Sequence, residues 1–243
     1  MESLNTNTGE WDTSIYQENP RRLSDEYYYT GDRMDSLKMY GQPYDLVAVF
    51  SYDADGRLTH SSSNYGEFCD YYYDSDGNVS RYVEYMLVNS TDTFSVKTAN
   101  YTWASGHIQR IECHYTYDSA STHQDNYYTW NGDRLVSTVC YSENSNGRRD
   151  TSAYTYEFSN IKNPFYGSVY WQRPTSLYSF TQSGVEGFCP YVVKHIIGIE
   201  NTSGDIQYEL TTSGDRLTGL REASYNERAD MRLWMTTDYE FEY

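Results

Sequence analysis

Residues 71–79 read Tyr-Tyr-Tyr-Asp-Ser-Asp-Gly-Asn-Val: aromatic residues, an acidic turn that contains glycine, and then an aliphatic residue. Residues 50–58 repeat this phrase as Phe-Ser-Tyr-Asp-Ala-Asp-Gly-Arg-Leu. Aromatic and polar residues that alternate with a period of two separate the two faces of a β-strand. Asp-Gly supplies the positive φ that a tight turn between antiparallel strands requires. The phrase therefore predicts a β-hairpin.

Further copies of the phrase occupy residues 27–34, 101–108, 128–135 and 208–217. The turn glycines of the first five copies lie 21 to 29 residues apart, at Gly31, Gly56, Gly77, Gly106 and Gly132. A period of about 25 residues accommodates two strands and two turns, so each repeat forms one hairpin. We predict an all-β antiparallel meander of about 12 to 16 strands, curled into a barrel-like sheet. A closed barrel and an open curled sheet both fit this pattern.

The composition agrees with a folded, tyrosine-packed chain of 243 residues. Its 29 Tyr and 5 Trp supply the apolar area that the scarce aliphatic residues do not. A formal charge of −17 excludes a nucleic-acid partner, because phosphate binding needs concentrated Lys and Arg. The sequence contains no apolar run of the length that a transmembrane helix needs.

The repeated phrase, of the form Tyr-x-Tyr-Asp-x-x-Gly-Arg-Leu, resembles the YD repeat of Rhs-type proteins, and residues 50–58 match it with Phe50 in the first position. Over residues 23–243 the chain also resembles an uncharacterised family of secreted envelope proteins from gut anaerobes, a domain of unknown function with a porin-like fold. The break after residues 154–165, the stretch 191–196 and the closing 239–243 carry this second resemblance. It implies a porin-like fold and a cell-envelope location, periplasmic or surface-exposed. Because members are often lipoproteins, we expect an export signal outside this sequence and a possible lipid anchor on the precursor.

The repeat organises the chain into an N-terminal extension or first strand at 1–22 and a single hairpin-repeat domain at 23–243. Within that domain, residues 159–190 are aromatic but do not alternate, which predicts an irregular cap or plug, with a ligand-contacting lid as the alternative. An outer-membrane barrel is the rival architecture. Tyrosines throughout the strands, together with Arg81 and Arg110 inside strand-like segments, disfavour it, so we expect a protein that does not span the membrane.

No motif for catalysis, a cofactor or a metal is found, and we predict neither an enzyme nor a metal site. The Asp-x-Asp-Gly turns at 53–56 and 74–77 lack the remaining ligands of a calcium loop. The five histidines form no known metal motif. The four cysteines stand far apart, which favours buried free thiols over a disulfide. Cys189 and His195 could be a nucleophile and a base, but without a third partner a structural role is favoured.

The function expected from these observations is a non-catalytic, monomeric cell-envelope protein that binds an extracellular ligand such as a glycan. Tyrosine and tryptophan rings stack on sugar rings, and neighbouring carboxylates and amides accept hydroxyl hydrogen bonds. Tyr170, Trp171 and Tyr178 are the predicted ligand contacts, because the strand pattern does not require them. Two alternatives stay open: a structural envelope protein or scaffold for another envelope protein, and a glycan-active hydrolase.

Overall fold

The structure, a computed structural model, describes residues 2–4, 11–13, 25–31, 33–40, 45–88, 92–117, 120–163, 166–167, 188–199, 205–214, 216–226 and 232–240. Throughout these residues the regular structure is β-strand, and no helix occurs. The described residues accordingly contain no helix that is long and apolar enough to cross a membrane.

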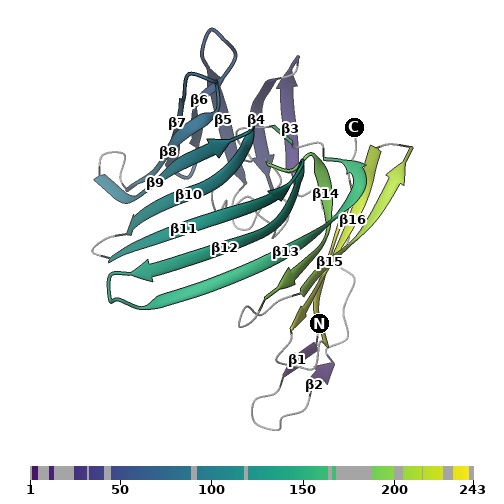
Figure 1. Cartoon of the computed structure of the whole chain (residues 1–243). Helices are drawn as coiled ribbons and strands as arrows, with labels where there is room; N and C mark the ends of the chain where they lie inside the picture. The colour runs from purple at the N-terminus through teal and green to yellow at the C-terminus, as the bar shows by residue number, and fades with distance from the viewer. Residues whose placement is uncertain are drawn as a thin grey trace. The chain divides into compact units, whose positions relative to one another are not determined.

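Fifteen strands form one antiparallel meander in which every strand lies beside its neighbours in the sequence, from β3 to β17 (Figure 1). A separate two-stranded sheet consists of β1 (Glu2–Leu4) and β2 (Trp11–Thr13). The predicted all-β meander is confirmed, and its strand count lies inside the predicted range.

The strands of the meander have the following bounds: β3 (Asp25–Thr30), β4 (Arg33–Met39), β5 (Leu46–Tyr52), β6 (Leu58–Ser63), β7 (Glu67–Tyr73), β8 (Val79–Val88), β9 (Asp92–Ala104), β10 (His107–Tyr117), β11 (Ala120–Asn131), β12 (Arg134–Asn144), β13 (Arg149–Lys162), β14 (Tyr191–Gly198), β15 (Asp205–Ser213), β16 (Arg216–Asn226) and β17 (Arg232–Glu240).

The chain divides into two compact units. One comprises residues 21–127 and 140–150, here called the first unit, and the other comprises residues 1–20, 128–139 and 151–243, the second unit. Whether residues 23–243 behave as a single domain stays a prediction. Each unit has its own buried residues: for example Leu37, Tyr82 and Ile111 in the first, and Leu135, Ile196 and Leu217 in the second.

Asx-type hydrogen bonds close the hairpin turns that the repeat predicted. The Asp74 Oδ1 atom accepts hydrogen bonds from the backbone N–H of Asp76 (3.0 Å) and Asn78 (2.9 Å). Asp53 makes the same pair of bonds in the preceding hairpin. The following glycine, Gly77, has a φ of 84°, a left-handed conformation that costs other residues about 1 kcal/mol or more. These carboxylates close turns, in agreement with the rejection of calcium loops.

Aromatic side chains join successive hairpins at three places in the first unit. Between hairpins, backbone pairing stops two residues short of the buried aliphatic residue that follows each turn. An aromatic donor from the next hairpin reaches the carbonyl of that residue. The bonds recur in three successive repeats: Tyr52 Oη to Met34 O at 2.6 Å, Tyr73 Oη to Leu58 O at 2.7 Å, and Trp103 Nε1 to Val79 O at 2.7 Å.

A register shift accompanies each of these aromatic donors. The shifts lie between Ser51 and Tyr52, between Tyr72 and Tyr73, and opposite Trp103 on β10. A β-bulge re-aims the side chain beside it, which here directs the donor toward the neighbouring hairpin. An arginine stacks on one of these donor rings. Arg57 follows the turn at residues 53–56, and its Cζ atom lies 5.2 Å from the centroid of the Tyr73 ring.

The predicted cap falls largely outside the described residues. Strand β13 continues to Lys162, so the first four residues of the expected irregular segment belong to a strand. The two ends of the segment are tied together, because Asn163 Nδ2 donates to the Cys189 carbonyl (2.8 Å) and Asn163 N donates to the Pro190 carbonyl (3.0 Å). Phe188 is buried and its ring lies 5.9 Å from that of Tyr128.

Replacing Tyr73 by Phe removes the hydroxyl that satisfies the Leu58 carbonyl, and we expect it to lower the free energy of unfolding by about 1 kcal/mol. Tyr72→Phe is the matched control, because the exposed Tyr72 ring lies on the opposite face of the same strand. Urea unfolding measures both variants. Equal stability losses in the two variants would contradict the proposed role of the Tyr73 bond.

The turn carboxylates make the fold sensitive to acid. Backbone N–H groups, foremost that of Arg57 for Asp53 and that of Asn78 for Asp74, hold the pKa of each carboxyl below its ordinary value. Both groups therefore stabilise the folded state above the unfolded pKa of about 3.9, and the contribution is lost as the pH falls through the folded pKa.

Asn144 occupies the equivalent position of a later turn and accepts the same two backbone bonds with an uncharged oxygen. We therefore expect Asp53→Asn/Asp74→Asn to keep the turns but to lose less stability than the wild type between about pH 5 and pH 2. Urea unfolding across this range tests the prediction. An equal fall in the free energy of unfolding in the two proteins would contradict it.

Candidate functional site

The two faces of strands β7 to β11 in the first unit differ in chemistry. Alternate residues such as Cys69, Tyr82 and Ile111 are buried, whereas those between them are half-buried or exposed. On the more exposed face, polar and aromatic residues stand directly opposite one another across the strands. One such row crosses all five strands and consists of Tyr72, Arg81, Asn100, Glu112 and Asp125.

Histidines and carboxylates gather on this face where β10 pairs with β11. The register places His114 opposite His123, Glu112 opposite Asp125, and Arg110 opposite Tyr127. Directly opposed residues of an antiparallel pair have Cβ atoms about 5 Å apart, so the side chains interact. The site is therefore assembled by strand pairing, from two segments that mirror each other about the connection between β10 and β11.

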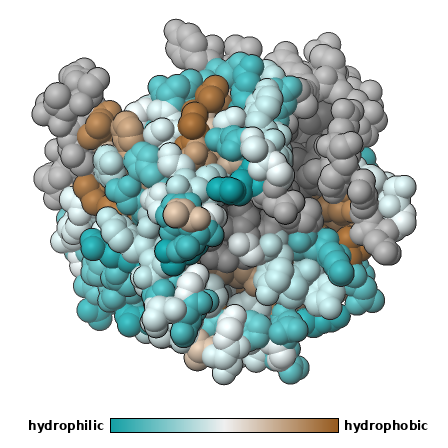
Figure 2. All heavy atoms as spheres, turned by 90° about the horizontal axis from the view of Figure 1, so that it is seen from above, coloured by the Kyte–Doolittle hydropathy of each residue, from teal (hydrophilic) through white to brown (hydrophobic). Residues whose placement is uncertain are grey.

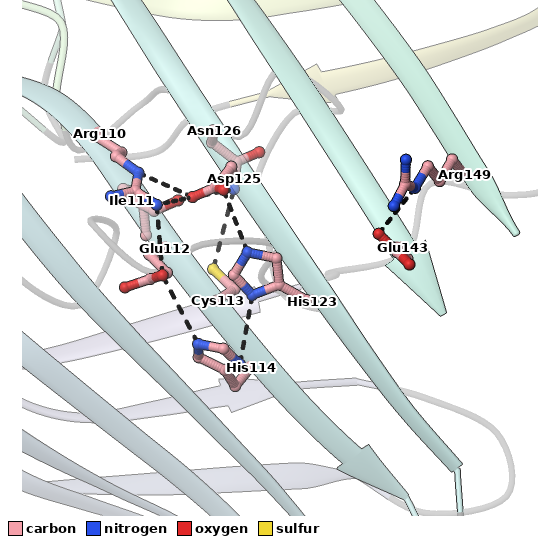
Figure 3. Close-up of polar contacts among 10 residues, drawn as sticks. All are labelled: Arg110, Ile111, Glu112, Cys113, His114, His123, Asp125, Asn126, Glu143 and Arg149. Carbon is pink, nitrogen blue, oxygen red and sulfur yellow. Dashed lines mark hydrogen bonds and ion pairs between the residues drawn. The ribbon is translucent and has the colours of Figure 1, made fainter. Parts of the chain in front are cut away.

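The side chains of this cluster contact one another in a chain (Figure 3). The His114 and His123 Nδ1 atoms lie 3.3 Å apart, and the ring centroids 4.5 Å apart. The other ring nitrogen, Nε2, of each histidine faces a carboxylate of the same strand. His123 Nε2 lies 3.2 Å from Asp125 Oδ2, and His114 Nε2 lies 3.9 Å from Glu112 Oε1. We call Arg110, Glu112, His114, His123 and Asp125 the β10–β11 cluster.

Arg110 holds the two carboxylates of the cluster. Its guanidinium donates to Asp125 Oδ1 at 2.5 and 2.8 Å and to Glu112 Oε1 at 3.3 Å. Partial burial acts to raise the pKa of Asp125, but hydrogen bonds from Arg110 and His123 outweigh it and leave the pKa below its ordinary value. Asp125 is therefore an ionised acceptor at neutral pH, and is poorly suited to donate a proton as a general acid.

Two tyrosines extend the cluster across the sheet. The Tyr127 ring lies 5.7 Å from the Arg110 Cζ atom and 5.9 Å, edge to face, from the Tyr141 ring. Tyr127 and Tyr141 are 42% and 52% exposed, so part of each ring is accessible to a ligand, while Arg110 lies over the Tyr127 ring. This surface combines ring faces, a cation and hydrogen-bond acceptors.

A second polar cluster faces the buried side of the same unit. Glu67, Cys69 and Glu84 place ligand-type atoms within 4.8 Å of one another. Tyr82 links them, because its hydroxyl lies 3.3 Å from Cys69 Sγ and donates to Glu84. The Cys69 thiol also donates to Glu67 at 3.6 Å. These groups contact one another on the more buried face of the sheet. Buried polar groups are generally hydrogen-bonded, and we assign these a structural role.

His60 and His195 each face carboxylates. His60 Nδ1 lies 2.7 Å from Asp70 Oδ1 on the exposed face of the first unit. In the second unit, His195 Nε2 lies 2.5 Å from Asp205, and Nδ1 lies 3.6 Å from Glu157. Carboxylates thus face both nitrogens of His195, in keeping with the structural role that was favoured over a base acting on Cys189.

The predicted contacts Tyr170, Trp171 and Tyr178 lie outside the described residues. The β10–β11 cluster did not emerge from the sequence, because its members match no local motif. A signal for it exists nonetheless: Arg-x-Glu-x-His at 110–114 mirrors His-x-Asp-x-Tyr at 123–127. Recognising it requires the position of the turn, and no glycine marks the connection between 117 and 120.

No protein-family model matches the sequence, and no curated protein matches it either. The fold is similar to the crystal structure of a porin-like protein from Bacteroides vulgatus, with a TM-score of 0.50 and 10% identity over 85% of this chain and 97% of that chain. A porin-like protein from Bacteroides uniformis matches with a TM-score of 0.38 and 12% identity, over 84% and 91% of the two chains. At this identity, the first match shows the fold alone, and it confirms the expected porin-like fold.

The four cysteines, all of them described, form no disulfide in the structure, and their reactivity should differ. Burial raises the pKa of Cys113 to about 12, so its thiolate is scarce at pH 8, whereas Cys140 is only half-buried. We expect an alkylating reagent to modify Cys140 first in the native protein and Cys113 only on unfolding. Peptide mapping by mass spectrometry measures both, and a thiol count under denaturing, non-reducing conditions should give four. Rapid native alkylation of Cys113 would contradict the burial.

Proposed function

We propose that the chain is a non-catalytic protein of a bacterial cell envelope that binds an extracellular glycan. The surface we assign to this role lies in the first unit, on the exposed face of strands β7 to β10 and of residues 120–127 and 140–144. The observation that carries the proposal is the pair of partly exposed tyrosine rings, Tyr127 and Tyr141, which lie beside Arg110 and its carboxylates.

Sugar recognition needs an apolar ring to stack on the C–H face of a pyranose, and polar groups to bind its hydroxyls. Tyr127 and Tyr141 supply the first, and Asp125 and Glu112 supply acceptors. The Tyr127 ring contacts Arg110 and Tyr141, so little rotamer freedom is lost when a ligand stacks on it. Such a surface fits a neutral or cationic sugar better than an acidic one, since the chain carries a charge of −17.

The same face is long enough for an extended ligand. The row from Tyr72 to Asp125 crosses four strand spacings, which is about 19 Å. Its far end carries another open ring, Tyr72, with the Arg81 Cζ atom 5.6 Å from the ring centroid. In the view of Figure 2, the described surface is mainly hydrophilic or of intermediate hydropathy, and hydrophobic residues form small separate patches. A polar, hydroxylated ligand suits such a surface better than an apolar one.

The location and form of the protein are part of the proposal. The porin-like fold and the YD-type phrase support an exported, monomeric envelope protein, on the periplasmic side or at the cell surface, with a lipid anchor on its precursor. The lowered pKa of Asp125 makes this residue unsuited to the acid role in the hydrolase alternative, because a glycosidase acid needs a raised pKa.

A glycan array followed by calorimetry on the best ligand tests the proposal. We expect Tyr127→Ala and Tyr141→Ala each to weaken binding about tenfold or more, the cost of losing a stacked ring at a binding surface. Tyr65→Ala is the matched control, because Tyr65 is also exposed (46%) but follows β6 in a turn.

Trp171→Ala separates this surface from the predicted contacts of the irregular segment. Loss of binding in that variant alone would move the ligand to residues 159–190. Absence of binding to every glycan would refute the proposal and leave a structural role or a protein partner.

A further inference from the structure

We propose that the β10–β11 cluster is a binding site for a divalent transition-metal ion of the Zn²⁺ or Cu²⁺ class. His114 and His123 provide Nδ1 ligands, Glu112 provides a carboxylate ligand, and Asp125 is a positioning residue. The sequence predicted no metal site, and the inference does not depend on glycan binding.

The separation of the two imidazole nitrogens fits a shared ion. Two ligands about 2.05 Å from a tetrahedral Zn²⁺ are about 3.3 Å apart. The His114 and His123 Nδ1 atoms are separated by 3.3 Å, and the ligand-type atoms of Glu112, His114 and His123 all lie within 4.8 Å of one another. The two imidazoles are thus spaced for one ion, and Glu112, whose carboxylate lies 3.9 Å from His114 Nε2, becomes the third ligand when its side chain turns toward the two Nδ1 atoms.

The surroundings of the imidazoles match those of metal-binding histidines. A ligating imidazole normally donates its other N–H to a carboxylate, which fixes the tautomer and directs the lone pair at the metal. His123 Nε2 faces Asp125 at 3.2 Å, and Arg110 holds Asp125 in turn. With Nε2 protonated, the lone pair of His123 Nδ1 points toward His114.

The donor set and the exposure define the class of ion. Two imidazoles and one carboxylate suit Zn²⁺, Cu²⁺ or Ni²⁺, whereas Ca²⁺ and Mg²⁺ prefer oxygen ligands alone. The His114 and His123 side chains are 57% and 38% exposed, so an ion can enter from solvent without opening the fold. Three protein ligands leave a coordination position for water or for a bound molecule.

The other described clusters support this choice. The His60–Asp70 pair lies on the same face but contains a single imidazole and one carboxylate. In the group Glu67, Cys69 and Glu84, the first two residues are buried, and the Tyr82 hydroxyl already contacts Cys69 and Glu84. The β10–β11 cluster is the one that combines two imidazoles, a carboxylate and solvent access among the described residues.

Calorimetric titration of the chelator-treated protein with ZnCl₂ tests the site. We expect one Zn²⁺ per chain and no comparable heat with CaCl₂. His114→Gln and His123→Gln should each weaken Zn²⁺ binding by roughly 100-fold, and Glu112→Gln and Asp125→Asn by about tenfold. His60→Gln is the matched control, because it removes a histidine from the same face and should leave the affinity unchanged.

Electron paramagnetic resonance of the Cu²⁺ complex separates ligands from the positioning residue. Asp125→Asn should keep the signature of two nitrogen ligands while the dissociation constant rises, whereas each histidine variant should lose one nitrogen. Circular dichroism checks that the variants fold. Absence of Zn²⁺ binding, binding indifferent to His114→Gln and His123→Gln, or an equal loss in His60→Gln would overturn the site. Tyr127→Ala should bind Zn²⁺ like the wild type. The zinc titration therefore tests the metal site independently of glycan binding.

Discussion

Successive hairpins in the first unit depend on an aromatic donor that satisfies a backbone carbonyl of the preceding hairpin. Where pairing between hairpins stops, the carbonyls of Met34, Leu58 and Val79 belong to buried residues that no longer have a ladder partner on that side. A buried acceptor left without a donor costs about 1–3 kcal/mol. One hydroxyl or indole N–H per repeat removes this cost, which explains why an aromatic residue with a polar end, and not phenylalanine, precedes these turns.

The sequence predicted the hairpins because the information for them is local. The Asp-Gly turns, the alternation and the period near 25 all lie within single repeats, and glycines such as Gly56 and Gly77 take the expected positive φ. The bulges beside Tyr52 and Tyr73 were not predicted, since a bulge depends on how two strands pair. The start of the irregular segment was misplaced for a similar reason: residues 159–162 read as irregular but belong to β13.

The candidate site was harder to predict than the fold, because it exists only in the register of β10 against β11. His114 and His123 are nine positions apart and belong to no motif, yet the pairing makes them neighbours. Sequence reasoning instead sought ligand contacts where the repeat fails, at Tyr170, Trp171 and Tyr178. The regular strands already expose rings and charges, because only one face of each strand is needed to bury the core.

Burial on one face of β10 constrains the geometry on its other face. Ile111 and Cys113 are almost fully buried, and a slip of one residue would expose them while burying Arg110 and Glu112. Burial of Ile111 and Cys113 therefore penalises odd shifts of register, and the hydrogen bond from Asn126 Nδ2 to the Ile111 carbonyl (3.4 Å) fits the register that sets His114 opposite His123 and Glu112 opposite Asp125. A site held by strand pairing is positioned more rigidly than one built on loops, because its spacing is that of the sheet itself. The constraint that stabilises the core of the first unit thus also holds the imidazoles and carboxylates in place for a ligand.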